Sequence, residues 1–267
     1  MAASRQAITA PWRLVARGLD LRRGVVTVLR GVDVEIQSGE CVSLIGPNGA
    51  GKTTLMLALL GLIEPSSGVV TIDDLPLRRL APKTRGRFAA YVPQFVERVP
   101  AFSVYDVVAS GRYPHTRPLQ PLGEHDHKHV RRILEMCGLT SVARRPVNQL
   151  SGGERQKTLI AAAIAQDAQI LFLDEPSTAL DPAHQVDLVR LLRTWRTGGR
   201  ALCIISHELA LPGALGGRVV ALGGGKIVAD APAETVLAPE SLSNIFGARF
   251  HEARTAGGAR VAVPEWD

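Results

Sequence analysis

Four short, almost continuously apolar runs recur along the chain, and each is followed closely by a residue suited to ligand binding. The runs cover residues 41–45, 89–93, 170–173 and 201–205, and the residues that follow them are Gly46, Gln94, Asp174 and His207. Runs of this length with helical patterns between them are typical of strands buried in a parallel sheet. Because ligands of open α/β sheets bind beyond the carboxyl ends of such strands, we expect the four residues to converge on one crevice. A strand end that merely reaches the surface would explain any one of them, but not the chemistry of all four.

Other patterns place antiparallel strands and helices around this sheet. Residues 12–38 alternate between apolar and polar with a turn at Gly24, which predicts an antiparallel side sheet. Residues 80–165 are richer in helical patterns, with helices expected over residues 129–138 and 154–165. We therefore predict an α/β fold with a mostly parallel sheet, an antiparallel β side sheet and an inserted helical subdomain.

The end of the chain adds a few short elements. Two strands are expected over residues 219–222 and 227–229, with a glycine turn between them, and a helix is expected over residues 239–246. The sequence contains no internal repeat or low-complexity tract.

Composition excludes several classes of protein. The chain has 267 residues, of which 46% are hydrophobic, and no apolar run reaches the ~18–20 residues of a membrane span. The net charge of +6 comes from scattered Lys and Arg with few aromatic residues, which gives little support for nucleic-acid binding. Three cysteines without pairing or metal spacing, and the lack of an apolar stretch before Pro11, predict a reducing, cytosolic location without a secretory signal.

A glycine-rich segment directly after the first apolar run predicts a phosphate site. Residues 46–53 match the pattern G-x-x-x-x-G-K-[ST], and a helix-like segment follows. Glycines allow backbone N–H groups to close around phosphates at a helix N-terminus, Lys52 adds positive charge, and the Thr53 hydroxyl can bind Mg²⁺. A glycine-rich turn that binds nothing is the weaker alternative. The predicted ATP-binding residues of this segment are Gly46, Pro47, Asn48, Gly49, Ala50, Gly51, Lys52, Thr53 and Thr54.

Two further segments carry chemistry that is ambiguous when each is taken alone. Asp174 and Glu175 end an apolar run, where an Asp can hold Mg²⁺ and a neighbouring carboxylate can act as general base, although a solvated strand end or an N-cap would look the same. Ser151 and Glu154 have the spacing of a capping box. The two glycines between them cost helix stability, which suggests close approach of a phosphate.

Taken together and in this order along the chain, these motifs resemble those of the ATP-binding cassette (ABC) ATPases. The resemblance rests on residues 46–53, Gln94, the segment 150–156, residues 173–175, the segment Ala179-Leu180-Asp181, and His207. It implies one nucleotide-binding domain over residues 12–250, with a core over about 12–80 and 166–230, a helical subdomain over about 81–165, and a C-terminal extension over 231–267. The implied cofactors are ATP and Mg²⁺.

The same resemblance implies a role for each site residue. Two copies would pair head to tail, so that Ser151, Gly152, Gly153 and Gln156 of one copy act in trans on the nucleotide of the other. Glu175 would activate water, His207 would contact the γ-phosphate, and Gln94 would sense the metal and link to the helical subdomain. Asp181 would communicate between the two sites. The implied Mg²⁺-binding residues are Thr53, Gln94 and Asp174.

One position departs from the family pattern. Where the family has an aromatic residue that stacks on adenine, this chain has Arg23 beside Gly24. A guanidinium group can also stack on a ring, so we expect Arg23 to contact the base.

A finer resemblance concerns the segments 111–115 (GRYPH) and 181–185 (DPAHQ), which are similar to those of ATPase subunits of bacterial importers for ferric siderophores, haem and vitamin B12. It implies a homodimer at the cytoplasmic face of the inner membrane, two copies of a permease, an indirect substrate-binding protein and no nucleic acid. A plain loop turn at Pro114 is the alternative explanation of the GRYPH segment. The alternative functions are a soluble ABC ATPase that acts on nucleic acid or ribosomes, and a small-molecule kinase, which would leave the segment 150–156 without a purpose.

Overall fold

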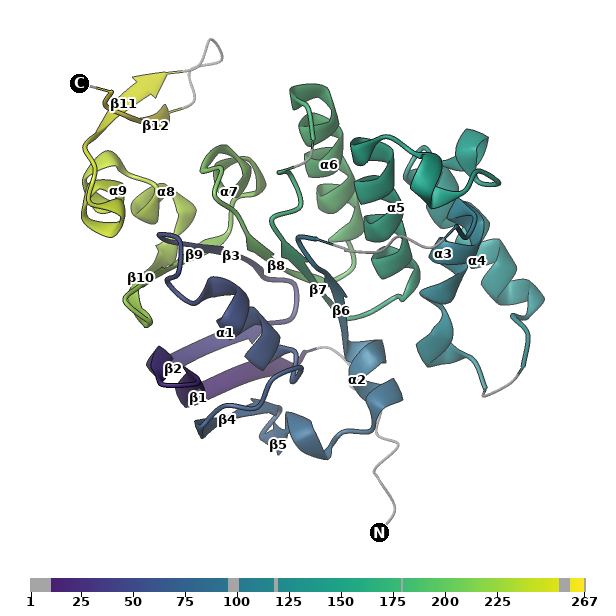
Figure 1. Ribbon diagram of the computed structural model, residues 1–267, viewed down its shortest axis with the longest axis horizontal. Coiled ribbons are helices and arrows are strands. Elements are labelled where there is room, and N and C mark those ends of the chain that lie inside the picture. Colours follow the sequence, from purple (N-terminus) through teal and green to yellow (C-terminus); the bar gives the residue numbers. More distant parts are fainter. Residues whose placement is uncertain (1–10, 96–100, 118–119, 179, 255–259, 267) are drawn as a thin grey trace. The chain divides into compact units, whose positions relative to one another are not determined.

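The computed structural model describes residues 11–95, 101–117, 120–178, 180–254 and 260–266 (Figure 1). They fall into two compact units. We call Leu80–Leu202 the helical unit, and Pro11–Arg79 together with Cys203–Asp267 the sheet unit. Strand β8 (Ala201–Ile205) begins in the helical unit and ends in the sheet unit. Within the described residues, no helix combines the length and the apolar character needed to cross a membrane.

The predicted side sheet is present in the sheet unit. It contains β1 (Arg13–Arg23), β2 (Val26–Gln37), β4 (Ser67–Ile72) and β5 (Leu75–Pro76) in the order β2-β1-β4-β5, and all its pairings are antiparallel (Figure 1). The buried face carries the apolar half of the alternation, including Leu14, Ala16 and Leu19. The turn between β1 and β2 contains Gly24 with a φ of 59°. This prediction is therefore confirmed.

The sheet unit also contains buried parallel strands. β3 (Cys41–Ile45) pairs in parallel with β9 (Arg218–Gly223), and β10 (Lys226–Pro232) runs antiparallel to β9. Helix α1 (Lys52–Leu59) follows β3, and α7 (Ala210–Leu215), α8 (Ala233–Val236) and α9 (Pro239–Phe246) follow later in the chain. The predicted bounds of α9 agree with the structure, whereas β9 and β10 are longer than predicted.

The C-terminal segments pack on the core of this unit. Ile45 and Val219 form a buried cluster with Val236 of α8 and Leu242 of α9. Phe250 packs against this cluster from the hairpin of β11 (Phe250–Arg254) and β12 (Arg260–Pro264).

The helical unit contains a second parallel pair, β6 (Ala89–Val92) and β7 (Ile170–Asp174). Its helices are α2 (Pro82–Phe88), α3 (Val104–Ser110), α4 (Glu124–Met136), α5 (Gly152–Ala165) and α6 (Pro182–Trp195). Short 3₁₀ turns cover Tyr113–His115, Thr140–Val142 and Val147–Gln149, and another, Leu77–Arg79, belongs to the sheet unit. Parallel strands, an antiparallel side sheet and a helical segment confirm the predicted fold class.

Two helices begin earlier than predicted. Helix α4 starts at Glu124 rather than at residue 129, because acidic residues stabilise its first turn. It ends before Gly138, whose φ of 65° is left-handed. Helix α5 starts at Gly152 rather than at Glu154, because the capping residue Ser151 places both glycines inside the helix.

The GRYPH segment caps the C-terminal end of α5. A Cβ atom on Gly111 would lie 2.1 Å from the carbonyl oxygen of Ala162 in α5, so only glycine fits there. Nη1 of the buried Arg112 donates to the carbonyl of Ala165 at 2.9 Å, and Nε2 of His115 lies 2.8 Å from the carbonyl oxygen of Gln166. Donors of this kind satisfy the last carbonyls of a helix. The segment is therefore a loop turn whose side chains also bind the C-terminal end of α5.

Arg112 also ties α5 to α4 through Asp126. Its Nε lies 2.8 Å from Oδ1 of Asp126. Burial alone would raise the pKa of this carboxyl group, but the hydrogen bond and the charge of Arg112 hold it below the usual value. Asp126 is therefore ionised near neutral pH.

We expect Arg112→Met to destabilise the protein by about 3 kcal/mol, because it leaves Asp126 and a helix-end carbonyl without their buried donor. Urea unfolding measures the change. Arg131→Met is the matched control, since the side chains of Arg131 and its partner Glu124 are 57% and 70% exposed. An exposed pair of this kind contributes at most about 1 kcal/mol. Equal losses of unfolding free energy in the two variants would contradict the stabilising role of Arg112 at the end of α5.

Candidate active site

The glycine-rich segment forms a loop between β3 and α1 of the sheet unit. Gly46, Gly49 and Gly51 adopt φ values of 136°, 76° and 101°, which side-chain-bearing residues rarely adopt. A Cβ atom on Gly46 would lie 2.1 Å from the carbonyl oxygen of Leu222. The loop therefore depends on its glycines for its shape.

The loop leads into a helix start that is suited to anions. The N-cap of α1 is Gly51, which has no side chain to cap the first turn. The buried ammonium group of Lys52 donates to the carbonyls of Gly46 and Pro47 at 2.8 and 3.0 Å, which holds its positive charge beside the loop. Uncapped N–H groups, the helix dipole and an adjacent cation together favour phosphate oxygens. Thr53 is exposed, whereas Thr54 is buried.

In the helical unit, the structure brings Gln94 and Glu175 together. Nε2 of Gln94 donates to Oε2 of Glu175 at 2.5 Å, and Oγ1 of Thr178 donates to the same oxygen at 3.1 Å. Glu175 has a φ of 50°, which is rare outside glycine and is often retained where function requires it. Its carboxylate is thus held just beyond β7. Thr178 was not predicted from the sequence, because only the tight turn after β7 brings it back to Glu175.

Asp174 is the last residue of β7 and is 2% exposed. Burial and the charge of Asp174 raise the pKa of Tyr91, in the neighbouring strand β6, to about 12. A buried negative charge at a strand end is a favourable environment for a cation. Nothing in the sequence around Tyr91 indicated this electrostatic interaction.

The helix start at Ser151 is a complete capping box. The backbone N–H and hydroxyl of Ser151 donate to Oε2 of Glu154 at 3.0 and 2.8 Å, and the backbone N–H of Glu154 lies 3.3 Å from Oγ of Ser151. These hydrogen bonds lower the pKa of Glu154. The predicted capping role of both residues is confirmed. Gln156, farther along α5, is 8% exposed.

Gly153, in the first turn of α5, has space around it within the chain. A Cβ atom there would lie 3.6 Å from Cδ2 of Leu180 and 3.6 Å from Nδ1 of His184, which are ordinary van der Waals distances. The chain itself therefore has room for alanine at this position.

The remaining predicted residues lie at element ends. Asp181 is the N-cap of α6, Arg23 is the last residue of β1, and His207 follows β8; both Arg23 and His207 are exposed. Ala179 lies outside the described residues. Arg23, His207 and the phosphate loop belong to the sheet unit, and Gln94, Asp174, Glu175 and the α5 start belong to the helical unit.

The sequence profile of the ABC transporter family matches residues 29–178, which is more than half of the 267 residues. The chain belongs to the ABC transporter family. The matched region contains the phosphate loop, Gln94, the α5 start and the pair Asp174 and Glu175. This ABC chain is an ATPase, and the family predicted from its motifs is confirmed.

Known relatives resemble this ABC ATPase over nearly its whole length. The hemin import ATP-binding protein HmuV of Enterobacter cloacae is 37% identical over 94% of this chain and 96% of its own. The ferric enterobactin transport ATP-binding protein FepC of Escherichia coli (strain K12) is 35% identical over 89% of this chain and 88% of its own.

Solved structures of ABC proteins share the fold. A metal-chelate type ABC transporter in an inward-facing conformation has a TM-score of 0.82 at 26% identity, covering 96% of this chain and 98% of the other. A dimeric ATP-binding cassette in a post-hydrolysis state, bound to ADP and Pi, has a TM-score of 0.73 at 25% identity and covers 82% of this chain and 98% of its own.

Proposed function

We propose that this chain is the ATP-hydrolysing subunit of a bacterial importer for haem, iron-siderophore or cobalamin-type cargo. Similarity to hemin and ferric enterobactin transport ATP-binding proteins over most of the chain supports the importer class. In this proposal two copies of the chain pair at the cytoplasmic face of the membrane and act on two copies of a permease. A substrate-binding protein presents the cargo to the permease. ATP closes the pair, and the helical unit transmits that movement to the permease.

The conformation of Glu175 is the observation that carries the catalytic part of the proposal. A left-handed backbone and two hydrogen bonds hold its carboxylate beyond β7, where it can accept a proton from water. The water oxygen attacks the γ-phosphorus, the bond from this phosphorus to the bridging oxygen breaks, and ADP and phosphate leave. The phosphate loop holds the nucleotide, Arg23 contacts its base, and His207 contacts the γ-phosphate.

The residues at the strand end and the loop fit Mg²⁺. Thr53, Gln94 and Asp174 offer hydroxyl, amide and carboxylate oxygens, which are the hard ligands that Mg²⁺ prefers, and the charge of Asp174 is buried. When bound, Mg²⁺ neutralises charge on the phosphate oxygens. The residues of the chain orient the nucleotide and the water.

The start of α5 would complete the nucleotide site of the other copy. Ser151, Gly152 and Gly153 are assigned to this site, together with Gln156, which is 8% exposed in the single chain. Neither steric contact within the chain nor a left-handed backbone explains glycine at position 153, so close approach of the other copy is the reason that this proposal gives for it. Asp181, which caps α6, would link the two sites.

Growth on haem as the only iron source tests haem, one of the proposed cargoes, together with the transport role. Cells that lack this chain should regain growth with the wild-type chain but not with Lys52→Ala, which loses the loop cation. The tagged chain should also recover a polytopic permease from detergent extracts of membranes. Recovery of ribosomes or DNA instead of a permease would favour a soluble ABC ATPase and contradict the importer.

A further inference from the structure

His184 lies in the first turn of α6, where both its backbone and its side chain contact Asp181. Its backbone N–H donates to Oδ1 of Asp181 at 2.9 Å, and its Nδ1 lies 2.9 Å from Oδ2. These hydrogen bonds lower the pKa of Asp181, so the carboxylate is ionised near neutral pH and can only accept hydrogen bonds. Nδ1 of His184 therefore carries the hydrogen and donates it. The two oxygens of Asp181 are thus each held by His184.

The same imidazole ring lies beside the first turn of α5. The 3.6 Å distances from a Cβ atom on Gly153 to Nδ1 of His184 and to Cδ2 of Leu180 place both side chains next to this glycine. His184 thus contacts the cap of α6 and also adjoins the helix start that contains Gly152 and Gly153. Sequence reasoning assigned it no role of its own.

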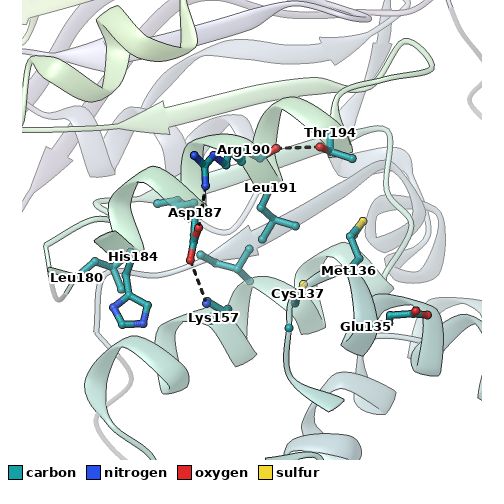
Figure 2. Close-up of a pocket in the computed structure, with 13 residues that line it drawn as sticks. Glu135, Met136, Cys137, Lys157, Leu180, His184, Asp187, Arg190, Leu191 and Thr194 are labelled. Atoms are coloured by element: carbon teal, nitrogen blue, oxygen red, sulfur yellow. Dashed lines mark hydrogen bonds and ion pairs between the residues drawn. The ribbon is translucent and has the colours of Figure 1, made fainter. Parts of the chain in front are cut away.

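His184 and Leu180 also line a cavity of about 410 Å³ that lies among α5, α6 and the C-terminal end of α4 (Figure 2). Apolar side chains such as Ile160 and Leu191 line it. The ion pair between Lys157 and Asp187 joins α5 to α6 at this cavity, but its atoms are 4.0 Å apart and Asp187 is 53% exposed. A pair of this kind contributes little. At the start of α5, the side chains that lie nearest to Gly153 are those of His184 and Leu180.

We propose that His184 is a positioning residue for ATP hydrolysis, which holds Asp181 in a constant geometry against the first turn of α5. The inference rests on the proposed function, since that function gives Asp181 and Gly153 their part in a site shared by two copies. His184 does not touch the nucleotide in this role. It acts by fixing the position of Asp181 relative to the first turn of α5, since both segments face the other copy in the proposed pair. A displacement of about 1 Å in such a site can lower the rate by up to 10²-fold.

Two substitutions separate positioning from bulk packing. His184→Leu keeps the volume but loses the side-chain donor to Asp181, and we expect kcat for ATP to fall roughly tenfold. His184→Asn places an amide N–H where Nδ1 stands, and it should retain most of the wild-type kcat. The full-length chain is used, and thermal unfolding shows whether each variant is folded. A His184→Leu variant with wild-type kcat, or an Asn variant as slow as the Leu variant, overturns the inference.

A double-mutant cycle tests whether His184 acts through Asp181. Asp181→Asn keeps a good N-cap but removes the charge that His184 holds. His184→Leu should lower kcat roughly tenfold in the wild-type background and less than about twofold in the Asp181→Asn background, because residues that act together are not additive. Equal factors in both backgrounds overturn the inference.

Comparison of Glu175→Gln with His184→Leu distinguishes an error in the proposed function from an error in the role of His184. If Glu175→Gln hydrolyses ATP at the wild-type rate, the proposed catalytic site is wrong, whatever His184 does. If Glu175→Gln is inactive and His184→Leu is fully active, only the role of His184 is wrong.

Discussion

Glu175→Gln is expected to lower ATP turnover by about 10²–10⁴-fold, the usual range for loss of a general base. Glutamine has the shape of glutamate and can still accept the hydrogen bond from Gln94, but it cannot take a proton from water. Binding of ATP should therefore persist, and the variant should accumulate as an ATP-bound pair. Steady-state hydrolysis and size-exclusion chromatography with ATP measure the two effects.

The control for this substitution is Glu124→Gln, the same chemical change at an exposed residue in the first turn of α4. It should leave turnover unchanged. Thr178→Val, which removes the second hydrogen bond to Glu175, should lower turnover less than Glu175→Gln, because Gln94 still orients the carboxylate. Wild-type turnover in Glu175→Gln would exclude Glu175 as the base.

The sequence predicted most successfully where burial alone decides the structure. The runs that became β3 and β8 are apolar at every position or nearly so, and their predicted bounds agree with the structure. The start of α4 was missed because residues 124–129 are all polar and carry no hydrophobic period. Charge at the helix N-terminus, rather than an apolar face, stabilises that turn.

In the candidate site too, some features follow from the local sequence and others depend on the fold. The pattern of glycines predicted the phosphate loop, since its backbone geometry depends on local sequence. The left-handed conformation of Glu175 and its hydrogen bond to Thr178 depend on the turn after β7 and on the packing around it, so no local pattern predicted them. His184 illustrates a third case. Its three-residue spacing from Asp181 is visible in the sequence, but its position beside Gly153 requires the fold.

Gly153→Ala should lower ATP turnover by about 10²-fold or more while the chain remains as stable as the wild type. The chain has room for a Cβ atom there, and alanine is a better helix former than glycine. In the proposed pair, however, an added methyl group at this helix start would leave less space for the phosphate of the other copy. Urea unfolding and steady-state hydrolysis measure the two properties.

Gly111→Ala is the matched control, because the same added methyl group would lie 2.1 Å from the carbonyl oxygen of Ala162 within the chain. We expect it to destabilise the protein by about 1–3 kcal/mol, as overpacking of a close contact does. Clear destabilisation by Gly153→Ala would show that its effect on turnover comes from folding and not from the shared site.

Mixing two inactive variants tests the shared site directly. Gly153→Ala retains the phosphate loop, and Lys52→Ala retains the α5 start, so a mixed pair assembles one intact site from the two chains. If the chains exchange freely, half of the pairs are mixed and each has one intact site of two, which predicts about a quarter of the wild-type turnover. A site built within a single chain could not be restored in this way. Turnover no higher than the sum of the two variants alone would therefore contradict the assignment of the α5 start to the nucleotide of the other copy.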